Sequence, residues 1–188
     1  YGIDMMSVSG QKLHCVKGIG FLYVKDGLEF NPLIYGSQQN GKRGGTYSTH
    51  LIAAFGKALE ITRKNNACRK VEILRNQLIQ KLVEIPGTYF NGAQIGINKL
   101  PNNISMTVNG VSAEEIVSLC DDYGIMIAKG SACQSYKATP SNTLLAIGLS
   151  EEQALSTIRI TLDENNTIDD IEEFTKTIKD VITILRKY

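Results

Sequence analysis

Ile125-Met126-Ile127-Ala128-Lys129-Gly130-Ser131-Ala132-Cys133 is an apolar run that leads directly into a loop of small residues. The apolar part, 125–128, predicts a short strand. A structural cysteine is expected inside a periodic apolar segment, whereas Cys133 stands where a loop would carry it into solvent. Reactive groups collect on such loops, and lysines at 129 and 137 place positive charge nearby. From this loop alone, an inert cysteine remains the alternative.

Outward from this loop, the chain alternates between the two periodicities of regular structure. Apolar runs and alternation predict strands at Met5–Ser9, Gly20–Val24, Thr88–Asn91, Asn103–Val108, Ile125–Ala128 and Thr157–Leu162. Apolar positions at helical spacing predict helices at Thr46–Asn66, 67–85, Ser112–Tyr123, Asn142–Ile147 and from Thr167 onward. Interleaved strands and helices predict a layered α/β fold.

Three local signals refine this prediction. Ile104, Met106 and Val108 alternate and should share one buried face of their strand. Ser112 and Glu115 have the spacing of a capping box. Thr167 precedes a long apolar stripe and should cap the last helix.

Composition narrows the function classes. The chain has 188 residues, 43% of them hydrophobic, which suits one globular domain or slightly more. Its net charge of +1 gives no electrostatic case for nucleic acid or membrane as a partner. Four cysteines form no C-x-x-C pair, and Cys68 and Cys120 fall in helical patterns, where packing is the expected role. With only two histidines, we expect no metal site.

A second candidate site follows the first strand, at Ser9-Gly10-Gln11-Lys12. A lysine held at a strand end by tight backbone can form a Schiff base if burial or a neighbouring cation keeps it partly neutral. The alternative is a surface lysine beside a turn, the commoner situation for lysine. This motif alone does not decide between them.

Several motifs in one order resemble the cysteine desulfurases of the NifS/IscS-like class, which are class V aminotransferases with a pyridoxal 5'-phosphate (PLP) cofactor and the fold type I architecture. They are Ser9-Gly10-Gln11-Lys12, Lys17-Gly18-Ile19-Gly20, Lys42-Arg43-Gly44-Gly45-Thr46, Gly130-Ser131-Ala132-Cys133 and Ser156-Thr157-Ile158-Arg159, with Pro101-Asn102-Asn103-Ile104-Ser105 as a further similar strand. The resemblance runs from about Asp4 to the C-terminal helix. Each motif is weak alone, and their order and spacing make the resemblance specific.

The resemblance implies roles for individual residues. Lys12 matches the lysine that binds PLP covalently, and Ser9 and Gln11 match contacts of the cofactor phosphate. Thr46 matches a residue that reaches the cofactor phosphate of the partner subunit, which implies a homodimer; its alternative role is a helix N-cap.

Arg159 and Cys133 complete the implied site. Arg159 matches the arginine that holds the substrate carboxylate, and a bidentate guanidinium suits that task; the alternative is an edge-strand arginine on a solvated face. Cys133 matches the nucleophile that takes sulfur as a persulfide. The long segment after Cys133 is similar to the mobile loop that delivers sulfur in this class.

Two departures from the family pattern stand out. Gln11 replaces a histidine, although an amide also donates hydrogen bonds. The family's catalytic unit is about twice as long, and the residues that contact the PLP ring lie upstream of the lysine motif. We therefore expect a C-terminal portion: residues 1–46 as a remnant of the large PLP-binding domain, 47–66 as an interdomain helix and 67–188 as the small α/β domain.

The implied function is a cysteine desulfurase that converts L-cysteine to L-alanine, supplies sulfur to an acceptor such as an iron–sulfur scaffold, acts in the cytoplasm and is inactive as this portion alone. Two alternatives stay open. One is a selenocysteine lyase or related PLP aminotransferase, and an aminotransferase would not need Cys133. The other is a non-catalytic sulfur-carrier or dimerisation module.

Overall fold

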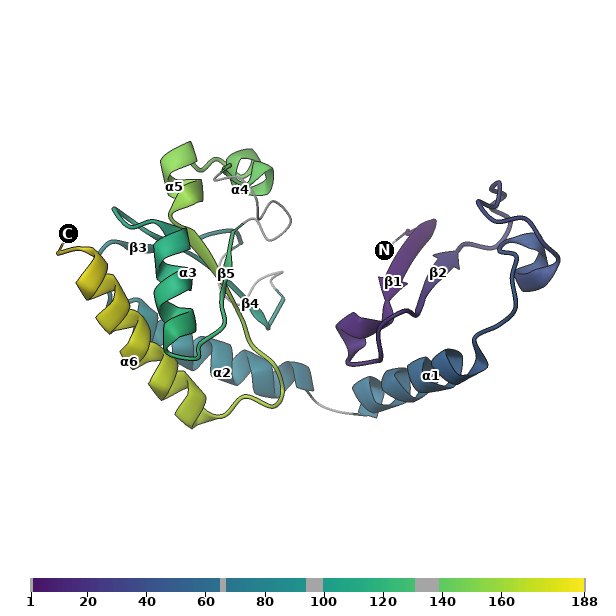
Figure 1. The fold of residues 1–188 in the computed structure, drawn as a ribbon, viewed down its shortest axis with the longest axis horizontal. Coiled ribbons are helices and arrows are strands. Elements are labelled where there is room, and N and C mark those ends of the chain that lie inside the picture. Colours follow the sequence, from purple (N-terminus) through teal and green to yellow (C-terminus); the bar gives the residue numbers. More distant parts are fainter. Residues whose placement is uncertain (1, 65–66, 94–99, 131–138, 188) are drawn as a thin grey trace. The chain divides into compact units, whose positions relative to one another are not determined.

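The protein divides into two compact units, residues 1–66 and 67–188, in a computed structural model that describes residues 2–64, 67–93, 100–130 and 139–187 (Figure 1). The finer assignment of 1–46 to a large-domain remnant and 47–66 to an interdomain helix stays a prediction.

The first unit is built on a two-stranded antiparallel sheet. Strand β1 (Met5–Ser9) pairs with β2 (Gly20–Val24), and the 3-10 helix η1 (Gly10–Leu13) lies between them. A short turn, η2 (Gln38–Gly41), and the helix α1 (Thr49–Lys64) follow. Both strands have the bounds expected from the sequence. Because α1 begins at Thr49, the alternative in which Thr46 caps this helix is wrong.

Little of this unit is buried. Phe55 on α1 is its one buried large apolar side chain among residues 2–64, and its ring centroid lies 5.6 Å from that of Phe21 on β2. The expected apolar face of α1 exists as a pattern, yet Ile52, Leu59 and Ile61 are exposed. The periodicity of α1 therefore identifies an apolar stripe that this unit covers only at its centre.

The second unit contains a four-stranded antiparallel sheet in the order β3-β4-β6-β5. The strands are β3 (Thr88–Phe90), β4 (Asn103–Val108), β5 (Ala128–Lys129) and β6 (Thr157–Thr161). The expectation of one sheet is confirmed, but a strand over Ile125–Ala128 is wrong. The Ile125 amide donates to the Cys120 carbonyl at 2.9 Å and closes the preceding helix, so pairing with β6 starts only at Ala128.

Three helices cover one face of this sheet: α2 (Ala67–Leu82), α3 (Ala113–Asp122) and α6 (Ile168–Leu185) (Figure 1). Their apolar side chains pack against Ile104, Met106 and Val108, which are completely buried as predicted. Burial of this apolar surface is the main driving force for folding of the unit.

The predicted N-cap residues of α3 and α6 both cap their helices, but the hydrogen bonding at α3 differs from the prediction. Thr167 caps α6 in a capping box with Asp170. Ser112 caps α3, but its hydroxyl accepts from the amide of Glu114 instead of Glu115, so the expected capping box is absent there.

Two short helices precede β6. Helix α4 (Asn142–Ala146) is close to the predicted helix, whereas α5 (Glu151–Leu155) was not predicted. A capping box between Ser150 and Gln153 starts α5, so a local signal for it was present in the sequence.

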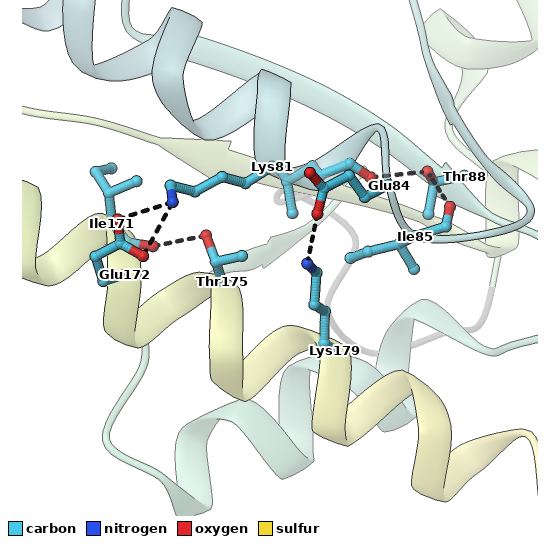
Figure 2. A network of polar contacts seen from close by, with 9 residues as sticks. Lys81, Glu84, Ile85, Thr88, Ile171, Glu172, Thr175 and Lys179 are labelled. Carbon is cyan, nitrogen blue, oxygen red and sulfur yellow. Dashed lines mark hydrogen bonds and ion pairs between the residues drawn. The ribbon is translucent and has the colours of Figure 1, made fainter.

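Ion pairs join α6 to α2 and the turn after it (Figure 2). The Lys81 ammonium lies 2.8 Å from Glu172, and the Lys179 ammonium lies 3.0 Å from Glu84. These side chains are largely exposed, and such pairs typically contribute at most about 1 kcal/mol each. They therefore add little to the stability of the unit.

The face of the sheet opposite these helices is polar. Ser105 and Thr107 of β4 stand directly across from Arg159 and Thr157 of β6. Cross-strand partners point to the same side of a sheet, so this face carries hydroxyl groups and one guanidinium. The apolar half of β4 and β6 faces the helices. On the polar half Arg159 is exposed, whereas Thr107 and Thr157 are buried.

Candidate active site

Lys12 lies on η1, the short helix that connects the two strands of the first unit. The Gly10 amide donates to the Ile19 carbonyl at 2.9 Å, and the Cys15 amide donates to the Gly10 carbonyl at 3.2 Å. His14 ends η1 in the left-handed conformation, with φ 58°. The backbone around Lys12 is thus fixed at both ends, while the side chains of Ser9, Gln11 and Lys12 are exposed.

Close backbone contact explains the glycines at this point. A Cβ on Gly20 would lie 2.4 Å from the Val8 carbonyl oxygen, and one on Gly10 would lie 2.9 Å from the Ile19 carbonyl oxygen. Only glycine permits these approaches without displacement of a strand. The Lys12 segment is therefore held by the packing of η1 on the hairpin.

Thr46 lies on a loop that is braced by its own hydrogen bonds. The Gly44 amide donates to the Ile34 carbonyl at 2.8 Å, and the Gly45 amide donates to the Gln38 side chain at 3.1 Å. The Gln39 amide donates to the Tyr47 hydroxyl at 3.0 Å. Thr46 itself is exposed, and within residues 2–64 no hydrogen bond joins it to the Lys12 segment.

Arg159 lies on β6, an inner strand, so the alternative of an edge-strand arginine is wrong. Its side chain is exposed on the polar face, with Ser105 opposite on β4 and Ala128 opposite on β5. Both neighbours are small. Among the described residues, Arg159 has no carboxylate partner, so its guanidinium can bind a carboxylate from outside the chain.

Cys133 lies outside the described residues, and only the segments next to it can be placed. Strand β5 leads toward it, and the Gly130 amide donates to the Thr157 carbonyl at 2.9 Å. The Lys129 ammonium lies 3.6 Å from the Glu114 carboxylate. Lys129 therefore points toward α3, where its charge is partly balanced.

The described cysteines are all free thiols in different surroundings. Cys120 is completely buried in α3, and burial raises the pKa of its thiol to about 11. It is a packing residue, as expected. Cys68 is exposed on α2, so the expected packing role for Cys68 is wrong. Cys15 is half-buried beside η1.

Lys12 and its neighbours fit one part of a PLP molecule. Ser9 and Gln11 offer side-chain donors beside an exposed amine, which suits a phosphate group next to an aldehyde. Asp4 does not belong to this set, because its carboxylate pairs with the Lys25 ammonium at 3.1 Å, at the end of the hairpin away from η1. Within the part of the chain that the structure describes, no cluster of three His, Cys, Asp or Glu side chains could hold a metal ion.

Comparison with known families agrees with these features. The family model for class V aminotransferases matches residues 1–174. The chain belongs to this family. This identification places the Lys12 and Arg159 segments inside a known enzyme family whose members generally use PLP.

Several named proteins are similar to this class V aminotransferase chain. "Cysteine desulfurase IscS 1" of Archaeoglobus fulgidus is 35% identical over 188 residues, which cover 98% of this chain and 49% of that protein. "Cysteine desulfurase IscS" of Clostridium botulinum is 36% identical over 184 residues, or 96% and 46% of the two. The chain therefore spans about half the length of the curated relatives it matches.

Solved structures agree on the fold. A "NifS-like protein" superposes with a TM-score of 0.84 at 28% identity, over 98% of this chain and 47% of that one. SspA, solved "in complex with cysteine", superposes with a TM-score of 0.65 at 34% identity, over 88% of this chain and 45% of that one. The α/β fold expected from the sequence is thus confirmed. In the described ranges, none of the helices has the length and apolar character needed to cross a bilayer.

Proposed function

We propose that this chain is the part of a cysteine desulfurase that carries the cofactor lysine, the sulfur acceptor and the carboxylate arginine, in Lys12, Cys133 and Arg159. The substrate is L-cysteine and the products are L-alanine and sulfur on Cys133. The chain alone is inactive, because it spans about half of its relatives.

One observation carries this proposal: the strand that leads to Cys133 pairs with the strand of Arg159. Ala128 stands directly opposite Arg159. Cys133 follows Ala128 by five residues, and five residues span at most about 18 Å. We infer that the thiol of a substrate whose carboxylate binds Arg159 comes within reach of the Cys133 segment.

The reaction balances without an added oxidant or reductant. The C–S bond of the substrate cysteine breaks, and an S–S bond forms between that sulfur and the sulfur of Cys133. The Cys133 proton and the electron pair of the broken bond end on the substrate, whose side chain becomes the methyl group of alanine. Bound PLP supplies the electron sink for this step. Lys12 holds the cofactor and moves a proton at its amine, while Arg159 orients the substrate.

The finer parts of this proposal concern partners and compartment. The protein acts as a homodimer in which Thr46 reaches the cofactor phosphate of the other subunit, and the exposed Thr46 hydroxyl is consistent with that role. The sulfur passes to an acceptor protein such as an iron–sulfur scaffold. A cytoplasmic location suits the free thiols at Cys15, Cys68 and Cys120.

The test uses this chain joined to the half of the Archaeoglobus fulgidus relative that it does not span. Cysteine binding is followed by spectral titration, and alanine and protein-bound persulfide are measured. Cys133→Ala should abolish persulfide and keep cysteine binding. Arg159→Ala removes a charge-assisted contact of about 1.5–3 kcal/mol and should weaken cysteine binding roughly 10- to 100-fold.

The same measurements separate the alternatives. Full turnover by Cys133→Ala would identify a related PLP aminotransferase or lyase that needs no thiol. Absence of PLP absorbance in the joined protein would favour a non-catalytic sulfur-carrier or dimerisation module.

A further inference from the structure

One row of side chains crosses the polar face of the second unit. The Asn91 backbone amide donates to the Ser105 carbonyl at 2.9 Å, so Asn91 lies beside Ser105 just after β3. Ser105 stands directly opposite Arg159, which in turn stands opposite Ala128. Cross-strand neighbours point to the same side of a sheet, with Cβ atoms about 4.5–5.5 Å apart. The exposed guanidinium of Arg159 therefore has a hydroxyl group on one side and a methyl group on the other.

A neighbouring row, two residues along β4 and β6, fixes the direction of the hydrogen bonds. The Gln153 carbonyl can only accept, so Thr157 donates its single proton there, at 2.6 Å. The Thr107 hydroxyl must then donate to Thr157 at 2.7 Å. Because that proton is used, Thr107 can only accept from Asn91. The Asn91 side-chain atom 2.9 Å from Thr107 is therefore the NH2 nitrogen.

This direction determines what the Ser105 hydroxyl can do. The same Asn91 nitrogen lies 3.3 Å from Ser105 Oγ. An amide NH2 group donates and does not accept, so Ser105 accepts this bond and keeps its own proton. Among the described residues, no acceptor takes that proton and no carboxylate pairs with Arg159. Ser105 and Arg159 thus present O–H and N–H donors side by side.

We propose that Ser105 is a second ligand of the carboxylate that Arg159 binds, and that Asn91 is the residue that positions it. This step rests on the proposed function, in which the carboxylate belongs to L-cysteine. The two oxygens of a carboxylate offer about four lone-pair sites. They can accept two N–H groups of the guanidinium fork and one O–H group as well.

The asymmetry of the row also orients the substrate. The arginine side chain is long enough to bend over either neighbour, but only Ser105, on the β4 side, adds a donor to the carboxylate. On the β5 side Ala128 offers no donor. The rest of the substrate then extends toward β5, the strand that leads to the Cys133 segment. Ser105 therefore helps to turn the substrate thiol toward the cysteine that receives the sulfur.

The first test compares two ligands of the joined protein, L-cysteine and cysteamine, which has the same amine and thiol but no carboxylate. Binding of both is followed by spectral titration. Ser105→Ala should weaken L-cysteine binding about 10-fold, because it removes one hydrogen bond to a charged group. It should change cysteamine binding less than twofold. Ser105→Thr keeps a hydroxyl group on the strand and should retain most of the parent affinity for L-cysteine.

Thr161→Ala is the matched control. Thr161 is exposed on the same face of β6, two positions after Arg159, but it lies outside the row, opposite Asn103. Its replacement should change L-cysteine binding less than twofold. Asn91→Ala should reduce the preference for L-cysteine over cysteamine roughly threefold, because Ser105 then loses the bond that directs its proton. A merely structural role of Asn91 would alter the binding of both ligands equally.

A second test needs neither cofactor nor activity. In the 188-residue chain alone, acetate should shift the side-chain N–H resonance of Arg159 in NMR spectra in a saturable way. Acetate is the probe because it carries a carboxylate and only a methyl group besides. Ser105→Ala should raise the dissociation constant for acetate at least threefold, whereas Thr161→Ala should leave it within twofold.

Four results would overturn the proposal. They are unchanged L-cysteine binding in Ser105→Ala, an equal loss of L-cysteine and cysteamine binding in that variant, equal weakening by Ser105→Ala and Thr161→Ala, and an Arg159 resonance that acetate does not shift. Acetate binding that depends on Ser105, together with a joined protein that forms no persulfide on Cys133, would leave the Ser105 assignment standing and count against the proposed function.

Discussion

Replacement of Thr157 by valine tests the hydrogen-bonded row on the polar face of the second unit. The Thr157 hydroxyl donates to the Gln153 carbonyl at 2.6 Å, so its only proton is committed. It lies 2.7 Å from the Thr107 hydroxyl, which must then be the donor of that pair. Thr107 in turn accepts from the Asn91 amide at 2.9 Å. The row therefore runs in one direction, from Asn91 just after β3 through β4 and β6 to α5.

The magnitudes follow from this direction. Thr157→Val removes two hydrogen bonds and leaves the Thr107 proton buried without an acceptor, because Thr107 is only 2% exposed. At about 0.5–1.5 kcal/mol for each bond, with an added penalty for the orphaned groups, the cost is about 2–4 kcal/mol. Thr107→Val should lower the free energy of unfolding by about 1–2 kcal/mol. The cost is smaller because Thr157 keeps its hydrogen bond to Gln153 and the Asn91 amide keeps its hydrogen bond to Ser105.

A double-mutant cycle checks this reasoning. The double variant has no orphaned hydroxyl, so its cost should fall short of the sum of the single variants by about 1 kcal/mol or more. Hydrogen exchange of β4 and β6 amides in urea measures the free energy of unfolding of this unit for all four proteins. Strict additivity, or a Thr157→Val protein within about 0.5 kcal/mol of the parent, would show that the row is not coupled as described.

Three further outcomes are expected. Iodoacetamide at pH 8 should label Cys133 first and Cys68 before Cys120, whose pKa near 11 and burial keep it a protected thiol; peptide mapping that finds Cys120 among the fast sites contradicts this. Hydrogen bonds from the Thr167 amide and from the Asn166 side chain lower the pKa of Asp170 in the folded protein. The carboxylate therefore stabilises the fold fully above its unfolded pKa near 4, and this contribution is lost as the pH falls through the lower folded pKa. Asp170→Asn should be less stable than the parent at pH 7 and lose that difference in acid, and acid titration of unfolding with an undiminished difference at pH 2 would refute it. Borohydride treatment of the chain mixed with PLP should leave Lys12 unmodified by mass spectrometry. Stable modification would show that residues beyond those this chain spans are not needed to hold the cofactor.

The sequence predicted the second unit well where periodicity reports burial. Ile104, Met106 and Val108 alternate because one face of β4 meets the helices, and the stripe of α6 behaves in the same way. The N-cap of α6 at Thr167 was predictable because the capping box to Asp170 depends on residues only three positions apart. These features depend on neighbours in sequence, which one chain fully displays.

One error is local, and the other concerns partners that are distant in sequence. Four apolar residues at 125–128 suit a strand, but the Ile125 amide donates to the Cys120 carbonyl five residues before it and so belongs to the C-terminal turn of α3. The stripe of α1 was correct as a pattern, although nothing in its spacing reveals that Ile52 and Leu59 are left exposed. Periodicity shows which face is apolar and not what covers it.

The candidate site was predictable as a set of motifs and only partly as geometry. The pairing of Ala128 with Arg159, which are 31 positions apart in the chain, brings the strand before Cys133 beside the strand of Arg159. The roles of Lys12 and Cys133 stay predictions. The row through Thr107 and Thr157 was missed, although these residues occupy the polar half of the alternation that identified the strands.

The inner position of β6 also limits how this protein can change length during evolution. A single inserted or deleted residue between α5 and β6 would shift the strand by one position, and a shift of one turns every side chain to the other face. Arg159 would then enter the apolar core, and Ile158 or Ile160 would replace it on the polar face. The turn at Asp163–Asn166, which follows β6, is free of this constraint, so length variation among related sequences should concentrate after the strand and be absent immediately before it.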